Sequence, residues 1–280
     1  MPGKEIESKD EYYVLETGRK GQCRLNLLHE VYGRETEKLL LGIGLKPGMH
    51  VADIGCGPGT VTFFLARHIS PAGIAYGVDS STEQLNVALE EAQKKDIKNV
   101  RFIKADVYSL GLKKDSFDMV YARSLLSHLQ DPLCAIIGMM RIVKPGGVLV
   151  CEDIDMATIH SEPTTAEYER SVEIWSALGA ERRTDYRVGS HMADLFRNAG
   201  FANVQETFHQ PKFISGEKKR YWEYTFYEVS PAMIRAGVLN DDELSRLKNG
   251  FEKIAENESV AVAQAAQFQV WAVKPEPFAQ

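Results

Sequence analysis

The sequence is poor in cysteine, and its hydrophobic residues form no long uninterrupted run. The four cysteines make no C-x-x-C pair, so the composition favours reduced thiols over disulfides or zinc ligands. No apolar stretch approaches the roughly 20 residues of a membrane-spanning helix. The N-terminal residues are polar and unlike a secretory signal. We therefore expect a cytoplasmic protein that binds no metal and no membrane.

Positive charge is not in excess either. Lysine and arginine total 33 against 39 acidic residues, which gives a formal net charge of −6. Proteins that bind nucleic acid usually present a basic face, so we expect no nucleic-acid partner and interpret the short basic clusters at 94–95 and 218–220 as solvated surface. With 280 residues, of which 44% are hydrophobic, the chain can form one large α/β domain with insertions, or two small domains.

The glycine-rich segment 53–61 lacks the features of two common phosphate-binding loops. A dinucleotide fingerprint would need glycine where Thr60 stands, and a P-loop would need a lysine after Gly59. The segment follows the apolar residues 49–52 and precedes an apolar-periodic stretch, which predicts a strand, a tight turn and a helix. Because glycine lets a ligand approach the backbone closely, the segment predicts a nucleotide-binding turn, and the surrounding residues indicate its type.

Acidic residues stand at the ends of the strands predicted around this turn. Asp53 closes the first strand onto a G-x-G-x-G turn, and Asp79 ends the next predicted strand, 74–78. This pattern resembles motifs I and II of the class I S-adenosylmethionine-dependent methyltransferases. Three further predicted strands have the order and spacing of that family, at 100–104, 117–123 and 148–152. The resemblance extends over about residues 45–155.

The resemblance implies an α/β fold with a Rossmann-like, seven-stranded, mostly parallel sheet, helices on both faces and an antiparallel last strand. The apolar periodicity predicts helices in an N-terminal cap over residues 1–43 and in insertions at about 156–187 and 215–256 of a methyltransferase domain over 44–280. An insertion between the last two strands lies above the carboxyl ends of the strands, where ligands bind, so we interpret these helices as a lid. Most aromatic residues of 221–227 are expected in the core, with one or two facing the pocket.

The cofactor of that family has a methionine carboxylate and amine, a ribose diol and an adenine, but no phosphate. The resemblance implies that Asp79 accepts the ribose hydroxyls and that Asp106 contacts the adenine amine. In small-molecule methyltransferases an N-terminal aromatic hydroxyl and an arginine reach over the cofactor, which implies Tyr13 near the methyl group and Arg24 near the carboxylate. The implied cofactor site comprises Tyr13, Arg24, Asp53, Gly55, Gly57, Gly59, Asp79, Ser80, Gln84, Asp106, Val107 and Arg123.

Methyl transfer from a sulfonium is an in-line displacement, in which the protein mainly positions the reactants and excludes water. A general base is needed when the acceptor is a hydroxyl or an acidic carbon. His128 follows the fourth predicted strand, and imidazole titrates near neutral pH, so His128 and Tyr13 are the candidate catalytic residues. The alternative for His128 is a ring that packs under the lid or bonds a backbone carbonyl. Glu152 and Asp155 follow the fifth strand and either contact the substrate or are solvated.

The sequence thus predicts an S-adenosylmethionine-dependent methyltransferase that acts on an oxygen, nitrogen or carbon atom of a small molecule. A protein or nucleic-acid methyltransferase is the alternative enzyme, although Tyr-Ala-Arg-Ser at 121–124 replaces the N-P-P-[YFW] tetrad of many enzymes that methylate nucleic-acid amines. A non-catalytic, cofactor-binding scaffold is the alternative from another class. The acceptor, the methylated atom and the oligomeric state stay open.

Overall fold

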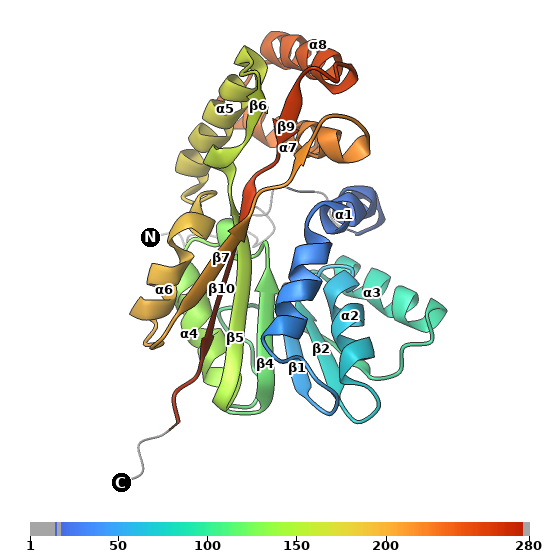
Figure 1. Ribbon diagram of the computed structural model, residues 1–280, viewed down its shortest axis with the longest axis vertical. Helices are drawn as coiled ribbons and strands as arrows, with labels where there is room; N and C mark the ends of the chain where they lie inside the picture. The colour runs from blue at the N-terminus through green and yellow to red at the C-terminus, as the bar shows by residue number, and fades with distance from the viewer. Residues whose placement is uncertain (1–14, 16–17, 277–280) are drawn as a thin grey trace, which may run out of the picture.

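The computed structural model describes residue 15 and residues 18–276, and a single large sheet organises this part of the chain (Figure 1). Its seven strands in the described residues have the order β3-β2-β1-β4-β5-β10-β7. They are β1 (His50–Ile54), β2 (Ile74–Asp79), β3 (Val100–Lys104), β4 (Phe117–Arg123), β5 (Val143–Asp155), β7 (Gln205–His209) and β10 (Ala266–Val273). β10 pairs antiparallel with both of its neighbours, whereas the other pairs are parallel. The predicted Rossmann-like α/β sheet with an antiparallel last strand is therefore confirmed.

Helices cover both faces of the sheet. On one face lie α1 (Gly18–Gly42), α2 (Thr60–Ile69) and α3 (Thr82–Lys94), and on the other lie α4 (Pro132–Ile142) and α6 (Met192–Asn198). Successive strand residues point to opposite faces, so Val51 packs with Leu40 and Phe64 in one buried cluster, while Ala52 packs with Ile136 in the other. The central strands are hydrophobic on both sides for this reason.

Side-chain caps fix where two of these helices begin. The Asp131 carboxylate accepts a hydrogen bond from the Cys134 backbone N–H at 2.9 Å, and Pro132 occupies the first helical position of α4. The Ser81 hydroxyl accepts from the Gln84 N–H at 3.3 Å at the start of α3. Such caps satisfy N–H groups that have no partner inside the helix. The α3 cap also places Gln84 directly after β2.

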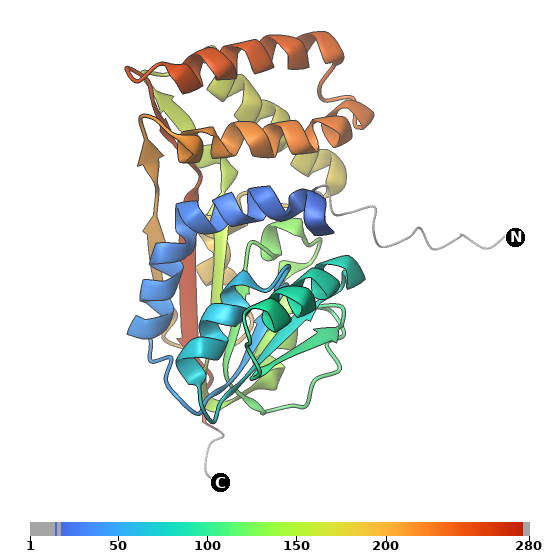
Figure 2. The ribbon, with the colours of Figure 1, turned by 90° about the vertical axis from the view of Figure 1, so that its right-hand side faces the viewer.

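A second layer rises from the carboxyl edge of the sheet. It contains η3 (Met156–Thr158), α5 (Ala166–Arg182), η5 (Glu217–Arg220), α7 (Tyr221–Arg235) and α8 (Asp241–Glu256), whereas η4 (Val188–His191) packs against β5, β10 and α6. Figure 2 shows α1, α7 and α8 stacked in that order away from the sheet, and contacts join α1 to α7, and α5 to both α7 and α8. The helical stretches expected at 156–187 and 215–256 are present as α5, α7 and α8.

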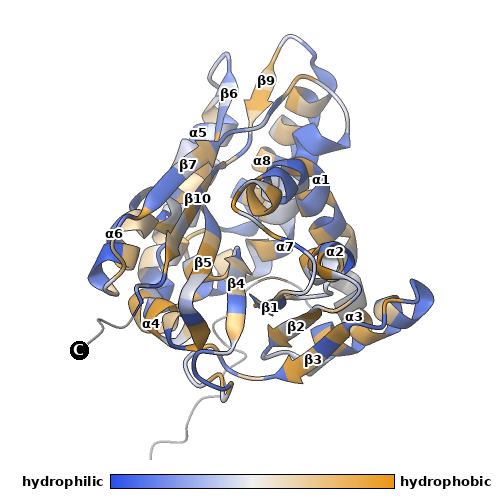
Figure 3. Cartoon of the chain, turned by 60° about the horizontal axis from the view of Figure 1, so that its bottom comes forward, coloured by the Kyte–Doolittle hydropathy of each residue, from blue (hydrophilic) through white to orange (hydrophobic). Residues whose placement is uncertain are grey.

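A small antiparallel sheet in this layer is absent from the sequence-based expectation. Its order is β6-β9-β8, with β6 at His160–Glu162, β8 at Lys212–Phe213 and β9 at Ala261–Ala263. Strands of two or three residues are too short to show a period of two. The C-terminal extended segment is divided between β9 and β10 at Gln264, whose amide donates to the Lys218 and Lys219 carbonyls. Figure 3 shows hydrophobic β9 and hydrophilic β7, whose side chains are mostly exposed.

The helical layer has its own hydrophobic core. Trp175 from α5 packs against Trp222 from α7, with 5.0 Å between the ring centroids, and Phe226 packs against Phe251 from α8. As expected, most aromatic residues of 221–227 are core residues. Within the described part of the chain, none of the helices is long and apolar enough to cross a membrane. Each of the four cysteines carries a thiol that forms no disulfide.

Candidate functional site

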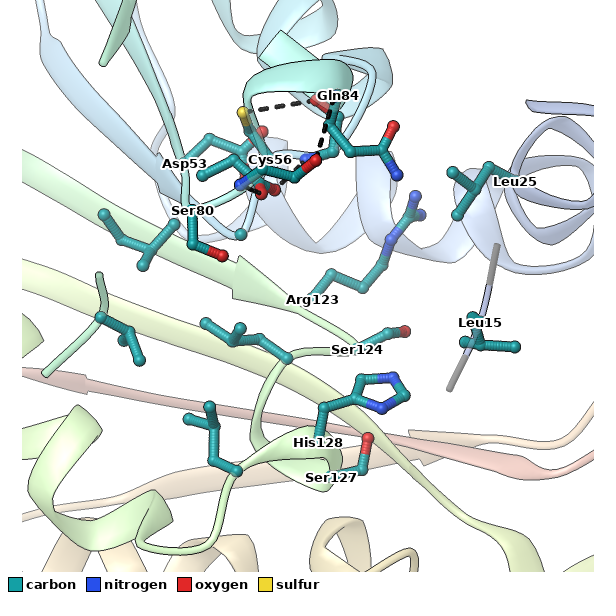
Figure 4. Close-up of a pocket in the computed structure, with 18 of the residues that line it drawn as sticks. Leu15, Leu25, Asp53, Cys56, Ser80, Gln84, Arg123, Ser124, Ser127 and His128 are labelled. Atoms are coloured by element: carbon teal, nitrogen blue, oxygen red, sulfur yellow. Dashed lines mark hydrogen bonds between the residues drawn. The ribbon is translucent and has the colours of Figure 1, made fainter. Parts of the chain in front are cut away.

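A cavity of about 1170 Å³ lies between the carboxyl edge of the sheet and the helical layer. Its sheet half consists of the lining residues within 53–61, 78–84 and 104–108, which follow β1, β2 and β3. Its helical half consists of Leu15, Arg24, Leu25, Leu28, Ser127, His128, Ile154, Met156, Trp175, Tyr186, Tyr221 and Thr225. Figure 4 shows Asp53, Ser80 and Gln84 on one side, Ser127 and His128 on the other, and Arg123 between them. Small-molecule sites usually enclose roughly 300–1,000 Å³, so this cavity has room for two ligands.

The glycine turn forms one wall of the sheet half. Gly55 has a φ of 73°, and a Cβ added to it would lie 3.0 Å from the Leu125 side chain. Gly57 has a φ of 53°, and a Cβ there would meet no protein atom within 4 Å. Because both line the cavity, the turn presents bare backbone to a ligand.

Gly59 is the exception within this turn. It does not belong to the described residues that line the cavity. A Cβ at this position would lie 2.9 Å from Phe63 and 3.3 Å from Ala88. The structure therefore gives Gly59 a packing role between α2 and α3, and the implied role at the cofactor gains no support.

Asp53 lines the cavity at the end of β1 and is only 3% exposed. Its carboxylate accepts a hydrogen bond from the Thr62 hydroxyl of α2 at 2.5 Å. Burial raises the pKa of Asp53 to about 6, although the Thr62 hydrogen bond and the Arg123 charge act in the opposite direction. Asp53 thus joins the first strand to the helix that follows the glycine turn.

Asp79 ends β2 and holds two loops together. Its carboxylate oxygens accept hydrogen bonds from the Gly57 N–H at 2.9 Å and from the Ser81 N–H at 2.8 Å. Burial raises the pKa of this carboxyl, against the effect of the N–H donors. A carboxylate offers about four lone-pair positions, so Asp79 can still accept hydroxyl groups from a ligand. Ser80, the next residue after Asp79, is exposed and also lines the cavity.

Gln84 carries an acceptor that the protein leaves unused. Its side chain is 4% exposed and lines the cavity, and its Oε1 has no hydrogen-bond partner among the described residues. A buried polar atom without a partner costs free energy, which a donor on a bound ligand would recover. Asp106 and Val107 line the same half after β3, and Asp106 accepts from the Tyr108 N–H at 2.9 Å. The sheet half therefore offers several acceptors to the N–H and O–H groups of a nucleoside.

Two arginines supply positive charge to the cavity. Arg24 of α1 is buried, and its Nε lies 2.8 Å from a carboxylate oxygen of Glu228 on α7. Arg123 ends β4 and donates from Nη1 to the Thr36 hydroxyl at 3.4 Å. Both line the cavity, so either guanidinium can meet an anionic group of a ligand.

Glu152 lies behind Arg123 and corrects one expectation. Its carboxylate is 1% exposed and accepts hydrogen bonds from the hydroxyls of Thr36, at 2.7 Å, and Tyr121, at 2.5 Å, and from the Gln269 amide. It is therefore neither solvated nor among the described residues that line the cavity. Instead, it joins α1, β4 and β10.

Asp155 is also buried and lies outside the cavity lining in the described residues. Its carboxylate accepts from the Ala157 N–H at 2.9 Å at the start of η3 and lies 3.7 Å from the Arg187 guanidinium. The expectation of substrate contact or simple solvation was wrong for Asp155 too, because the end of β5 is covered by the next segment.

His128 lines the helical half from η2 (Leu126–His128). Its ring lies 6.2 Å from that of Tyr186, at 75°. Burial lowers the pKa of His128 to about 4, and the charges of Arg24 and Arg182 act in the same direction. The expectation that this ring titrates near neutrality is therefore wrong for the structure as it stands. A neutral imidazole at pH 7 remains able to accept a proton or a hydrogen bond.

Tyr13 lies outside the described residues, so its implied roles near the methyl group and in catalysis stay predictions. In the described part of the chain, no group of three or more histidine, cysteine, aspartate or glutamate side chains is arranged to hold a metal ion. Sequence reasoning missed Met156, Tyr186 and Thr225 of the helical half, because no spacing distinguishes them from core residues.

The sheet order, the glycine turn after β1 and the acids after β2 and β3 together define the class I methyltransferase fold. Residues 45–224 match the family model described as a methyltransferase domain, and the chain belongs to this family. It is an S-adenosylmethionine-dependent methyltransferase, as the sequence predicted. This cofactor supplies a methyl group bound to a sulfonium, which a nucleophile can accept.

Similar proteins agree with this assignment. An uncharacterized methyltransferase of Schizosaccharomyces pombe is 34% identical over 125 residues, which are 42% of this chain and 45% of that protein. A demethylmenaquinone methyltransferase of Lactococcus lactis is 27% identical over 202 residues, which are 65% of this chain and 75% of that protein.

Solved structures of low sequence identity share the fold. The YcgJ protein of Bacillus subtilis superposes with a TM-score of 0.59 at 19% identity, over 87% of this chain and all of that one. A phosphoethanolamine N-methyltransferase of Haemonchus contortus, solved with S-adenosylhomocysteine, gives 0.53 at 20% identity, over 91% of this chain and 53% of that one.

Proposed function

We propose that the protein transfers the methyl group of S-adenosylmethionine to a small-molecule acceptor held in the helical half of the cavity. The observation that carries this proposal is the covered cavity of about 1170 Å³, which exceeds the usual volume of a single small-molecule site. The relative named for demethylmenaquinone provides independent support for a small-molecule acceptor.

The sheet half would hold the cofactor. Asp79 would accept the ribose hydroxyls, while Gln84 and Asp106 would accept N–H groups of the adenine. Arg24 or Arg123 would pair with the methionine carboxylate. The proposed cofactor residues within the described chain are Arg24, Asp53, Gly55, Gly57, Asp79, Ser80, Gln84, Asp106, Val107 and Arg123.

The helical half would bind and orient the acceptor. Positioning the two reacting atoms accounts for much of the acceleration in such displacements, and the covering helices would exclude water. If the acceptor is a hydroxyl or an acidic carbon, neutral His128 would receive its proton at a ring nitrogen. If it is a neutral amine, His128 would act on acceptor position instead.

We interpret the helical layer as a lid over this site. Leu25 and Leu28 of α1, Trp175 of α5, and Tyr221 and Thr225 of α7 line the cavity from above the sheet. α8 contributes none of the described lining residues and packs behind α5 and α7. The lid would thus comprise the cap within 1–43, the insertion 156–187 and the first part of 215–256.

The net charge of −6 supports an acceptor other than nucleic acid. The four free thiols support a cytoplasmic setting. The test has two parts. Calorimetry should show binding of S-adenosylmethionine and S-adenosylhomocysteine but not of NAD. Incubation with methyl-labelled cofactor and a fractionated cell extract should then place the label in the low-molecular-weight fraction. Label confined to protein or nucleic acid, or tight NAD binding without cofactor binding, would contradict the proposal.

A further inference from the structure

The acidic residues that line the cavity are distributed unevenly. Asp53, Asp79, Glu83 and Asp106 all belong to the sheet half. Among the described residues of the helical half, none is acidic, and the charged lining residue is Arg24. Among the described lining residues, a cationic molecule in the helical half would therefore meet no carboxylate to offset its loss of hydration.

The walls of the helical half are largely apolar, and they include the rings of Trp175, Tyr186 and Tyr221. The Tyr186 ring lies edge-on to both Trp175, with 5.5 Å between centroids, and His128. Tyr221 of α7 and the aliphatic side chains of Leu25, Leu28, Ile154 and Met156 complete the lining. Aromatic side chains favour planar aromatic ligands through stacked and edge-to-face contacts.

Two buried polar groups in these walls, the Trp175 indole N–H and the Tyr186 hydroxyl, have no hydrogen-bond partner among the described residues. Trp175 is 1% exposed, and its Nε1–H finds no hydrogen-bond acceptor among the described residues. The neighbouring Trp222 is equally buried, but its Nε1–H donates to the Ser171 hydroxyl at 2.9 Å, and it lies outside the described cavity lining. Buried indole N–H groups normally find a partner, so the exception at Trp175 points to an acceptor atom on the ligand.

We infer that the helical half binds an uncharged or anionic aromatic acceptor, and that Trp175 donates a hydrogen bond to an oxygen of this molecule. The inference rests on the proposed function, since it names the class of acceptor for the same site. The surroundings of His128 agree with it. Burial and, to a smaller extent, the charges of Arg24 and Arg182 lower the pKa of that ring. A cationic ligand beside it would meet the same loss of hydration and the charge of Arg182, while Arg24 is paired with Glu228.

Three naphthalenes of similar size test this inference on the full-length protein saturated with S-adenosylhomocysteine. The probes are 1-naphthol, 1-methylnaphthalene, which replaces the hydroxyl by a methyl group, and 1-naphthylmethylamine, which is cationic at neutral pH. We expect 1-naphthol to bind about five- to tenfold more tightly than 1-methylnaphthalene. The amine should bind at least about tenfold more weakly than 1-naphthol.

Two matched variants locate the hydrogen bond. Trp175→Phe keeps an aromatic ring but removes the N–H, so it should abolish the preference for 1-naphthol over 1-methylnaphthalene. Trp222→Phe is the control, because its N–H is already bonded to Ser171, and the preference should persist. Affinity for S-adenosylhomocysteine should be unchanged in both variants.

Separate outcomes overturn separate claims. Equal binding of the amine and 1-naphthol, or an unchanged 1-naphthol preference in folded Trp175→Phe, would overturn the inference. The proposed function would still stand in that case, provided that the protein binds the cofactor. No binding of S-adenosylhomocysteine to the wild-type protein would overturn the proposed function itself. Should Trp175→Phe fail to fold, the order of the three probes on the wild-type protein still decides the charge and polarity of the acceptor.

Discussion

The two halves of the cavity are built in opposite ways. The sheet half comes from three short segments, 53–61, 78–84 and 104–108, that follow neighbouring parallel strands, and hydrogen bonds to backbone N–H groups fix its carboxylates. The helical half draws on side chains from Leu15 to Thr225, and most of them are apolar or aromatic. Polar recognition is thus encoded locally in this chain, whereas the acceptor site depends on the packing of elements far apart in sequence.

The largest expected effect separates catalysis from cofactor binding. With a hydroxyl acceptor, His128→Ala should lower turnover by about 10²–10⁴, because no other imidazole of the described residues lines the cavity. The dissociation constant for S-adenosylmethionine should stay nearly unchanged, as measured by calorimetry. His191→Ala is the control, since His191 is exposed and pairs with Asp185 outside the cavity.

Full activity of His128→Ala with a known hydroxyl acceptor would remove His128 as the base. Tyr13 would then be tested next, whereas buried Glu152 would not, because its carboxylate already accepts three hydrogen bonds.

The next largest effect is a loss of cofactor affinity when a carboxylate of the sheet half is removed. Asp79→Ala should weaken binding of S-adenosylmethionine by about ten- to a hundredfold, because it removes an ionised acceptor for two hydroxyl groups. Asp194→Ala, on the exposed surface of α6, serves as a control for a lost carboxylate. An unchanged dissociation constant in folded Asp79→Ala would remove this residue from the cofactor site.

A smaller effect concerns stability against acid. His128 has a lowered pKa of about 4 in the folded protein, against an ordinary value of 6.5. Between these values the unfolded chain binds the proton more readily, so stability falls as the pH decreases through this window. Between about pH 7 and pH 5, the free energy of unfolding measured in urea titrations should fall by about 1–2 kcal/mol less in His128→Gln than in the wild type.

His29 provides a comparison for this effect, because burial also lowers its pKa to about 4 while it lies outside the described cavity lining. Adding S-adenosylhomocysteine should leave unchanged the contribution of His29 to the pH dependence of the free energy of unfolding. An identical pH dependence in the wild type and His128→Gln would show that the ring titrates normally and that the helical half is more hydrated than its geometry indicates.

The same contrast explains how far the sequence could be interpreted. Asp53, Gly55, Gly57, Asp79 and Asp106 line one cavity, because strand ends and turns are local patterns and parallel strands bring their carboxyl ends together. Gly59 belongs to the same pattern, but its packing against Ala88 depends on how α3 lies against the start of α2.

The remaining features depend on long-range contacts. The pKa of His128 depends first on burial and then on the charges of Arg24 and Arg182, which lie more than fifty residues away in the sequence, so no local spacing indicates these effects. Trp175 of α5 and Trp222 of α7 are both buried helical residues, although Trp175 lines the cavity and the Trp222 N–H donates to Ser171. The small β6-β9-β8 sheet is equally invisible, since its strands are very short.

Amide hydrogen exchange, recorded without ligand and with S-adenosylhomocysteine, tests most directly whether the two halves act as one site. We predict slower exchange in the sheet half and also in α1 and α7, which line the cavity. A lid is among the less stable parts of a structure, and ligand binding orders it. α8 should change little, since it packs behind them. Protection confined to residues 45–155 would contradict this account and leave the helical layer peripheral.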